Sequence, residues 1–242
     1  LLIAQEYFQF AILNVDEQIQ KPALDYSQQL LQLASKSKNK ELQEDALTCI
    51  ANNSLLIGQY NQALNAALQL PQDNLKTKIL LANIYYQTGD IVACKKTSQE
   101  VMFLSYKSCD LCFDLLAKSS YGEGQLKDVL YLQQKHLAFE QLFEIDCGGS
   151  IYLEIAETYA RLGDNSKAIR SLNQYADFLS NPCCNTQSIL FDLISLDDFV
   201  DVPLKKVAFS KIAESILTNS VFASLTSDAD FQRIIEKIKA LS

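Results

Sequence analysis

The sequence contains no tryptophan, a single histidine and a single methionine among its 242 residues. It also lacks an uninterrupted apolar run of about 18 residues, the length that a membrane-spanning helix needs, so we expect no transmembrane segment. The apolar opening carries Glu6 and no leading basic cluster, which argues against a secretory signal peptide. Because Met102 is the single methionine, we expect that Leu1 is not a translation start and that further sequence precedes it.

Positive charge is also scarce. The chain has 21 Lys and Arg against 29 Asp and Glu, a formal net charge of −8, and its longest basic runs are the pairs Lys95-Lys96 and Lys205-Lys206. Attraction to phosphate requires clustered Lys and Arg. We therefore expect no direct nucleic-acid contact from this region and no membrane partner.

Motifs for catalysis and metal binding are nearly absent. Cys109 and Cys112 form a C-x-x-C, but a thiolate zinc site needs four converging ligands and no second C-x-x-C exists. The same spacing places both sulfurs on one helix face, as core packing would. The single histidine, His136, has no nucleophile or orienting partner in the pattern, and no Gly-rich phosphate loop occurs. We expect no enzyme activity, no cofactor and no metal.

The seven cysteines are an odd number scattered over a long chain, which is unlike a disulfide framework. Several fall at positions where a helix would bury them, and there a reduced cysteine acts as a small hydrophobic residue. The reduced thiols favour a cytoplasmic location.

What the sequence has is helical periodicity arranged around four glycines. Residues 152–179 read as two amphipathic helices separated by Gly163-Asp164-Asn165. The same arrangement recurs around Gly58, Gly89 and Gly124, so that successive glycines are 31, 35 and 39 residues apart by subtraction. Small or slim apolar residues stand seven positions before and five positions after each glycine, namely Ala51, Ala82, Ala117 and Ala156 before, and Ala63, Cys94, Val129 and Ala168 after. Such residues let two helices approach closely.

This pattern resembles the tetratricopeptide repeat (TPR), whose period is about 34 residues. Departures from the repeat are the missing tryptophan and an alanine in place of the usual glycine of the first helix. The resemblance implies an all-α fold, a right-handed α-solenoid of TPR-like helical hairpins with a helical C-terminal cap. We assign residues 1–182 to about five hairpins and residues 183–242 to a helical capping region of the same domain.

The helix boundaries follow from periodicity, glycine and proline. In the faint first hairpin we place a turn near Gln18 and expect Pro22 in the first turn of the helix that follows. Asp228 is the expected N-cap of the last helix. Other predicted helices cover residues 1–14, 22–37, 41–56, 60–70, 75–88, 90–104, 107–121, 125–144, 186–196 and 203–217.

A ligand-binding groove is expected on the inner surface, where the first helices of such hairpins lie. Six residues before the four turns stand Asn52, Asn83, Lys118 and Glu157, which should share one row. Asn side chains both donate and accept hydrogen bonds and can hold the backbone of an extended peptide. Tyr86, Tyr121 and Arg161 lie near this row and could add stacking or carboxylate pairing. The alternative is an ordinary polar helix face.

Longer segments permit a narrower comparison. The phrases SLLIGQYNQALNAALQLP and FEIDCGGSIYLEIAETYARLGDNSKAIRSLNQYADF, and the closing VFASLTSDADFQRIIEKI, resemble the C-terminal TPR sensor region of Gram-positive, XRE-type helix-turn-helix transcriptional regulators. The resemblance covers most of residues 53–237. It implies a non-catalytic, effector-sensing and dimerising module that binds a protein or short peptide, with a DNA-binding domain upstream. The alternative is a scaffold or chaperone-cofactor module that docks an extended segment of a partner protein.

Overall fold

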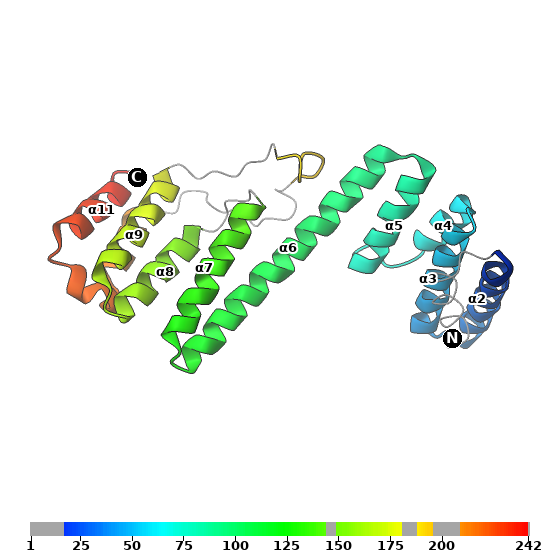
Figure 1. Ribbon diagram of the computed structural model, residues 1–242, viewed down its shortest axis with the longest axis horizontal. Helices are drawn as coiled ribbons and strands as arrows, with labels where there is room; N and C mark the ends of the chain where they lie inside the picture. The colour runs from blue at the N-terminus through cyan, green and yellow to red at the C-terminus, as the bar shows by residue number, and fades with distance from the viewer. Residues whose placement is uncertain (1–16, 144–148, 181–187, 196–208, 242) are drawn as a thin grey trace. The chain divides into compact units, whose positions relative to one another are not determined.

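The computed structural model describes residues 17–143, 149–180, 188–195 and 209–241 (Figure 1). Within these ranges every regular element is a helix and no β-strand occurs. The chain divides into two compact units, Leu1–Leu104 and Ser105–Ser242, which we call the N-terminal unit and the C-terminal unit. None of the helices in the described ranges is both long enough and apolar enough to cross a membrane.

The N-terminal unit is a series of antiparallel helical hairpins. Its elements are α2 (Glu17–Ser37), α3 (Lys40–Leu56), α4 (Tyr60–Ala67), α5 (Leu75–Thr88) and the first part of α6 (Ile91–Gly122). Helices α3 and α5 begin at asparagine caps. The side-chain oxygens of Asn39 and Asn74 accept hydrogen bonds from the backbone amides of Leu42 and Lys76. The apolar side chains of α2, α3, α4 and α5 form one core.

The first helix of this unit differs from the prediction. Gln18 lies inside α2, so the predicted turn near Gln18 is wrong. Pro22 is also well inside the helix rather than in its first turn. The residues before Pro22 contain no glycine or other helix stop, so the helix begins earlier, at Glu17. Pro22 then costs α2 one backbone hydrogen bond, because proline has no amide hydrogen to donate. The residues predicted as the preceding helix, 1–14, lie outside the described ranges.

The C-terminal unit contains two further hairpins and a helical cap. Its elements are the second part of α6, then α7 (Leu126–Leu142), α8 (Gly149–Arg161), α9 (Asn165–Ser180), α10 (Phe209–Thr218), the 3₁₀ helix η2 (Ser220–Leu225) and α11 (Ala229–Lys239). Asp228 caps α11 as predicted, because its carboxylate accepts the amides of Asp230 and Phe231 at 2.8 and 3.2 Å. Apolar side chains of α10, η2 and α11 form one core with those of α8 and α9.

The four predicted turn glycines share one backbone conformation. Gly58, Gly89, Gly124 and Gly163 have φ values of 75°, 78°, 75° and 77°. This left-handed region is disfavoured for residues with a Cβ atom, so glycine ends each first helix without strain. The residue after each glycine then closes the turn, as in the bond from the Asp164 amide to the Tyr159 carbonyl at 2.9 Å.

The predicted small residues lie where the paired helices cross. Ala51 and Ala63 are both 0% exposed in the hairpin of α3 and α4, and Ala156 and Ala168 are both 0% exposed in that of α8 and α9. Ala117 and Val129 are also buried. The hairpin of α5 and α6 is looser, with Ala82 and Cys94 only half-buried.

One predicted helix boundary is wrong in the middle of the chain. We expected helices to end at Leu104 and restart at Lys107, but α6 runs without a break from Ile91 to Gly122, 32 residues. Only Ser105 and Tyr106 stand between the two predicted helices, and neither stops a helix. Tyr106 is instead buried and stacks on Phe139 of α7, with ring centroids 5.6 Å apart and planes 6° apart. The division of the chain at Leu104 and Ser105 therefore falls inside one helix.

A second difference follows α9. Residues 188–195 form turns where a helix was predicted. Phe191 of this segment is buried, so one aromatic side chain is packed without a regular helix around it. The fold class itself is confirmed: in the residues that the structure describes, the chain is all-α and is built from TPR-like helical hairpins that end in a helical cap.

Candidate functional site: a polar cavity on three helices

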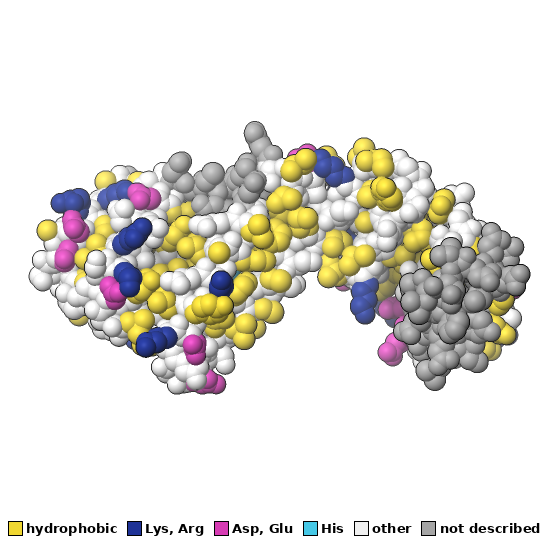
Figure 2. Space-filling view, viewed as in Figure 1, with side chains coloured by type: hydrophobic (Ala, Val, Ile, Leu, Met, Phe, Trp, Pro, Cys, Tyr) yellow, Lys and Arg dark blue, Asp and Glu magenta, His cyan; other side chains and the backbone are white. Residues whose placement is uncertain are grey.

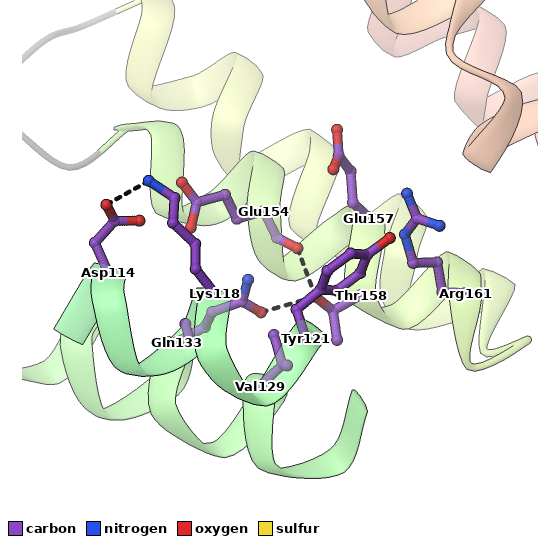
Figure 3. Close-up of a pocket in the computed structure, with 10 residues that line it drawn as sticks. Asp114, Lys118, Tyr121, Val129, Gln133, Glu154, Glu157, Thr158 and Arg161 are labelled. Atoms are coloured by element: carbon purple, nitrogen blue, oxygen red, sulfur yellow. Dashed lines mark hydrogen bonds and ion pairs between the residues drawn. The ribbon is translucent and has the colours of Figure 1, made fainter. Parts of the chain in front are cut away.

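A cavity of 520 Å³ lies in the C-terminal unit on α6, α7 and α8 (Figure 3). A volume of this size is typical of ligand pockets in proteins. Its lining residues are Asp114, Ala117, Lys118 and Tyr121 of α6, Val129 and Gln133 of α7, and Glu154, Glu157, Thr158 and Arg161 of α8, with Tyr121 and Val129 flanking the turn at Gly124.

Three of the predicted site residues meet in this cavity. Lys118, Tyr121 and Arg161 all line it, together with Glu157 from the predicted row. The Arg161 guanidinium carbon lies 5.2 Å from the centre of the Tyr121 ring, a cation–π arrangement. Lys118 forms an ion pair with Asp114, its neighbour one turn earlier, with Nζ 2.6 Å from the carboxylate. The prediction that these side chains bind a ligand stays a prediction.

The floor of the cavity is built from satisfied polar groups. The Thr158 hydroxyl donates to the Gln133 side-chain oxygen at 2.9 Å, and this bond links α8 to α7. Glu157 accepts a hydrogen bond at 2.9 Å from Asn219, the cap residue of η2. These bonds fix the side chains of Thr158 and Glu157 on α8. Side chains that are already ordered lose less conformational entropy when a ligand binds.

Glu154 is the carboxylate that the cavity leaves least satisfied. Figure 3 shows it on the far side of the Lys118 ammonium from Asp114. Within the described ranges, no hydrogen bond or ion pair of the Glu154 side chain is found. Burial raises the pKa of Glu154, and the nearby charges of Asp114 and Glu157 raise it further, against a smaller opposing effect of Lys118. Burial also raises the pKa of Glu157, although Arg161 and the bond from Asn219 oppose this.

Replacing Glu154 by Gln should stabilise the protein at neutral pH. Because the folded-state pKa is raised above its ordinary value of 4.5, the folded state holds more protons than the unfolded state, and stability falls as the pH rises from 4.5 through the raised value. Glu154→Gln removes that loss. We expect a gain of about 0.5 kcal/mol at neutral pH, kept small by solvent screening, and none in acid below 4.5. Urea unfolding followed by circular dichroism at both pH values measures it.

The matched control for this change is Glu214→Gln, an exposed glutamate on α10. It should leave the urea midpoint unchanged at both pH values. A Glu154→Gln protein that is less stable than the wild type at neutral pH, or equally stabilised at both pH values, would contradict the electrostatic interpretation.

The other predicted site residues belong to the N-terminal unit. Asn83 and Tyr86 line a shallower cavity of 310 Å³ between α5 and α6, and the Tyr86 side chain is 62% exposed. Asn52 lines neither cavity. Its side-chain amide donates to the Thr48 carbonyl at 2.9 Å within α3, so that donor is already engaged.

Sequence reasoning missed Asp114, Gln133, Glu154 and Thr158. A signal for two of them was available. Asp114 lies four residues before Lys118, and Glu154 lies three residues before Glu157, and such neighbours share one face of a helix. Gln133 and Thr158 come together only through the packing of α7 on α8, which local spacing does not encode.

Charged groups of both signs are mixed on the surface of the C-terminal unit. On the face shown in Figure 2, Lys and Arg side chains alternate with Asp and Glu and with apolar side chains, and no broad basic patch forms there.

No protein-family model matches the chain, and no curated protein matches it. A solved structure that is similar is described as a "putative kinesin light chain nearly identical TPR-like repeats" from Podosopora anserina, with 12% identity over 98% of this chain and 93% of that chain. The TM-score is 0.31, so this likeness carries no argument about function.

Proposed function

We propose that this chain is a non-catalytic protein- or peptide-binding module whose ligand occupies the cavity on α6, α7 and α8. The observation that carries the proposal is the Glu154 carboxylate, which lies half-buried in a cavity with more carboxylates than cations. Three carboxylates and two cationic groups line it. The fixed hydrogen bonds around Thr158 and Glu157 give the cavity the rigidity that recognition requires.

The ligand that fits this cavity is an extended protein segment with a Lys or Arg side chain. Such a cation would pair with Glu154 and offset the repulsion between Glu154, Asp114 and Glu157. The exposed ring of Tyr121 offers an apolar surface beside the cation. None of these residues forms the nucleophile and base pair that a hydrolytic site needs.

The experiment compares two fluorescein-labelled random peptide libraries, one with a fixed central Lys and one with a fixed central Glu. Fluorescence anisotropy should show tighter binding of the Lys library by the wild type. Glu154→Lys should remove this preference, because it places a like charge where the peptide cation would bind. Glu214→Lys, the same charge change on exposed α10, should retain it. Equal binding of both libraries by the wild type would contradict the proposal.

The finer proposal is that the module is the effector-sensing and dimerising part of a cytoplasmic bacterial transcriptional regulator. Its support is the sequence resemblance of residues 53–237 to the C-terminal region of XRE-type regulators. A helix-turn-helix pattern immediately upstream in the full-length sequence, together with a dimer in analytical ultracentrifugation, would support it. A secretion signal upstream would contradict it and favour the scaffold or chaperone-cofactor alternative.

A further inference from the structure

A second polar cluster lies between α6 and α7, apart from the residues that line the cavity. It consists of Asp110 on α6 and of His136 and Glu140, one turn apart on α7. One ligand atom from each of the three residues lies within 4.8 Å of the other two. His136 and Glu140 are buried, at 7% and 4% exposure. Asp110 is 26 positions before His136, so the local pattern around His136 does not indicate this partner.

The cluster has the composition of a transition-metal site. Imidazole nitrogen and carboxylate oxygens are ligands for divalent ions of the zinc class, and three protein ligands leave a position open for water or a further ligand. Two carboxylates, that of Glu140 buried and that of Asp110 partly exposed, lie beside one buried imidazole. A divalent cation would offset both negative charges, which a neutral hydrogen-bonded partner cannot do.

The distances are close to those of a bound ion. The His136 Nε2 atom is 2.7 Å from Asp110 Oδ1 and 3.9 Å from Glu140 Oε1. Two ligand atoms on one tetrahedral ion with bonds of about 2.0–2.2 Å stand about 3.3–3.6 Å apart. To bind an ion, the Asp110 oxygen must therefore move away from the imidazole nitrogen by about 0.6–0.9 Å, and the Glu140 oxygen must approach it by about 0.3–0.6 Å. The Asp110 side chain is 37% exposed, so it is less confined by packing than the other two ligands.

Neighbouring side chains hold these ligands in place. Phe113 stacks on the His136 ring, with centroids 5.1 Å apart and planes 13° apart. The Tyr106 hydroxyl donates to the Glu140 carboxylate at 3.4 Å. Outer contacts of this kind fix the orientation of metal ligands and raise affinity.

We propose that Asp110, His136 and Glu140 bind a divalent transition-metal ion of the zinc class and thereby join α6 to α7. The ion would stabilise the folded state by binding to it and not to the unfolded chain. None of the three ligands lines the cavity proposed above to bind a peptide, although the charge of Asp110 also raises the pKa of Glu154 in that cavity.

The test is titration of the chelator-treated protein with Zn²⁺ by calorimetry and with Co²⁺ by visible absorption. We expect one ion per chain, a higher thermal midpoint, and Co²⁺ bands without thiolate charge transfer. Asp110→Asn and His136→Gln should each weaken metal binding at least about tenfold. Removing a side chain that only supports a metal ligand already lowers affinity by about this factor, and removing the ligand itself should cost no less. Asp110 is partly exposed, so Asp110→Asn remains informative if the His136 variant fails to fold.

The exposed pair Cys109 and Cys112 on the same helix provides the control. Replacing both by Ser should leave the affinity and the cobalt spectrum unchanged. The proposal is overturned if the wild type binds neither ion. It is also overturned if binding disappears in the double Ser variant, or if a folded Asp110→Asn protein binds as tightly as the wild type.

Discussion

Phe231→Ala should lower the free energy of unfolding by about 3–5 kcal/mol, the cost of removing a buried aromatic ring from a packed core. Phe231 is 0% exposed and lies 6.1 Å from the ring of Phe222, also 0% exposed. It joins the cap to the core of α8 and α9. Because small domains are stable by only about 5–15 kcal/mol, this loss is large. The urea midpoint from circular dichroism measures it.

The control removes an aromatic ring that is not part of the core. Tyr131 on α7 is 59% exposed, so Tyr131→Ala should change the unfolding free energy by less than about 1 kcal/mol. Equal urea midpoints for the Phe231→Ala and Tyr131→Ala proteins would show that the cap does not belong to the folding core of the C-terminal unit.

Ala168→Leu should destabilise the protein by about 1–3 kcal/mol, because it inserts three carbon atoms where the helices α8 and α9 cross. Ala168 and its counterpart Ala156 are both 0% exposed, so the added side chain has no free volume. The change tests the spacing argument directly, since the position follows from its offset to Gly163. Chemical unfolding measures the loss.

An alanine outside the crossing serves for comparison. Ala138 lies on an exposed face of α7, and Ala138→Leu should leave stability within about 0.5 kcal/mol. Equal unfolding free energies for the Ala168 and Ala138 variants would show that the α8–α9 crossing is not tightly packed.

The hairpins were predictable because their determinants are local. A glycine can adopt a positive φ at low cost, and its position in the chain marks the turn whatever surrounds it. Alanine at a fixed offset from that glycine marks the crossing, as Ala51 and Ala156 show. The cap of the last helix was predictable for the same reason. The Asp228 carboxylate accepts hydrogen bonds from the backbone amides of residues only two and three positions later.

Features that depend on packing between helices were not predictable. Tyr106 is buried within α6 and stacks on Phe139, 33 residues later by subtraction, a contact that local sequence does not indicate. The pairing of His136 with Asp110 likewise arises from the way α7 lies on α6. Periodicity indicates which face of a helix is buried but not which residues of two helices meet there. For the same reason it did not indicate that Gln133 and Thr158 meet at the cavity.

The uninterrupted course of α6 also affects how the protein resists proteolysis. Compact units are commonly joined by exposed linkers, which proteases cut readily because the backbone there is unpaired. Here the division at Leu104–Ser105 falls in the interior of a helix. A protease must unwind several turns before that peptide bond can enter its active site. The boundary between the two units is therefore protected from cleavage, and preparations of either unit alone will not arise by nicking at this place.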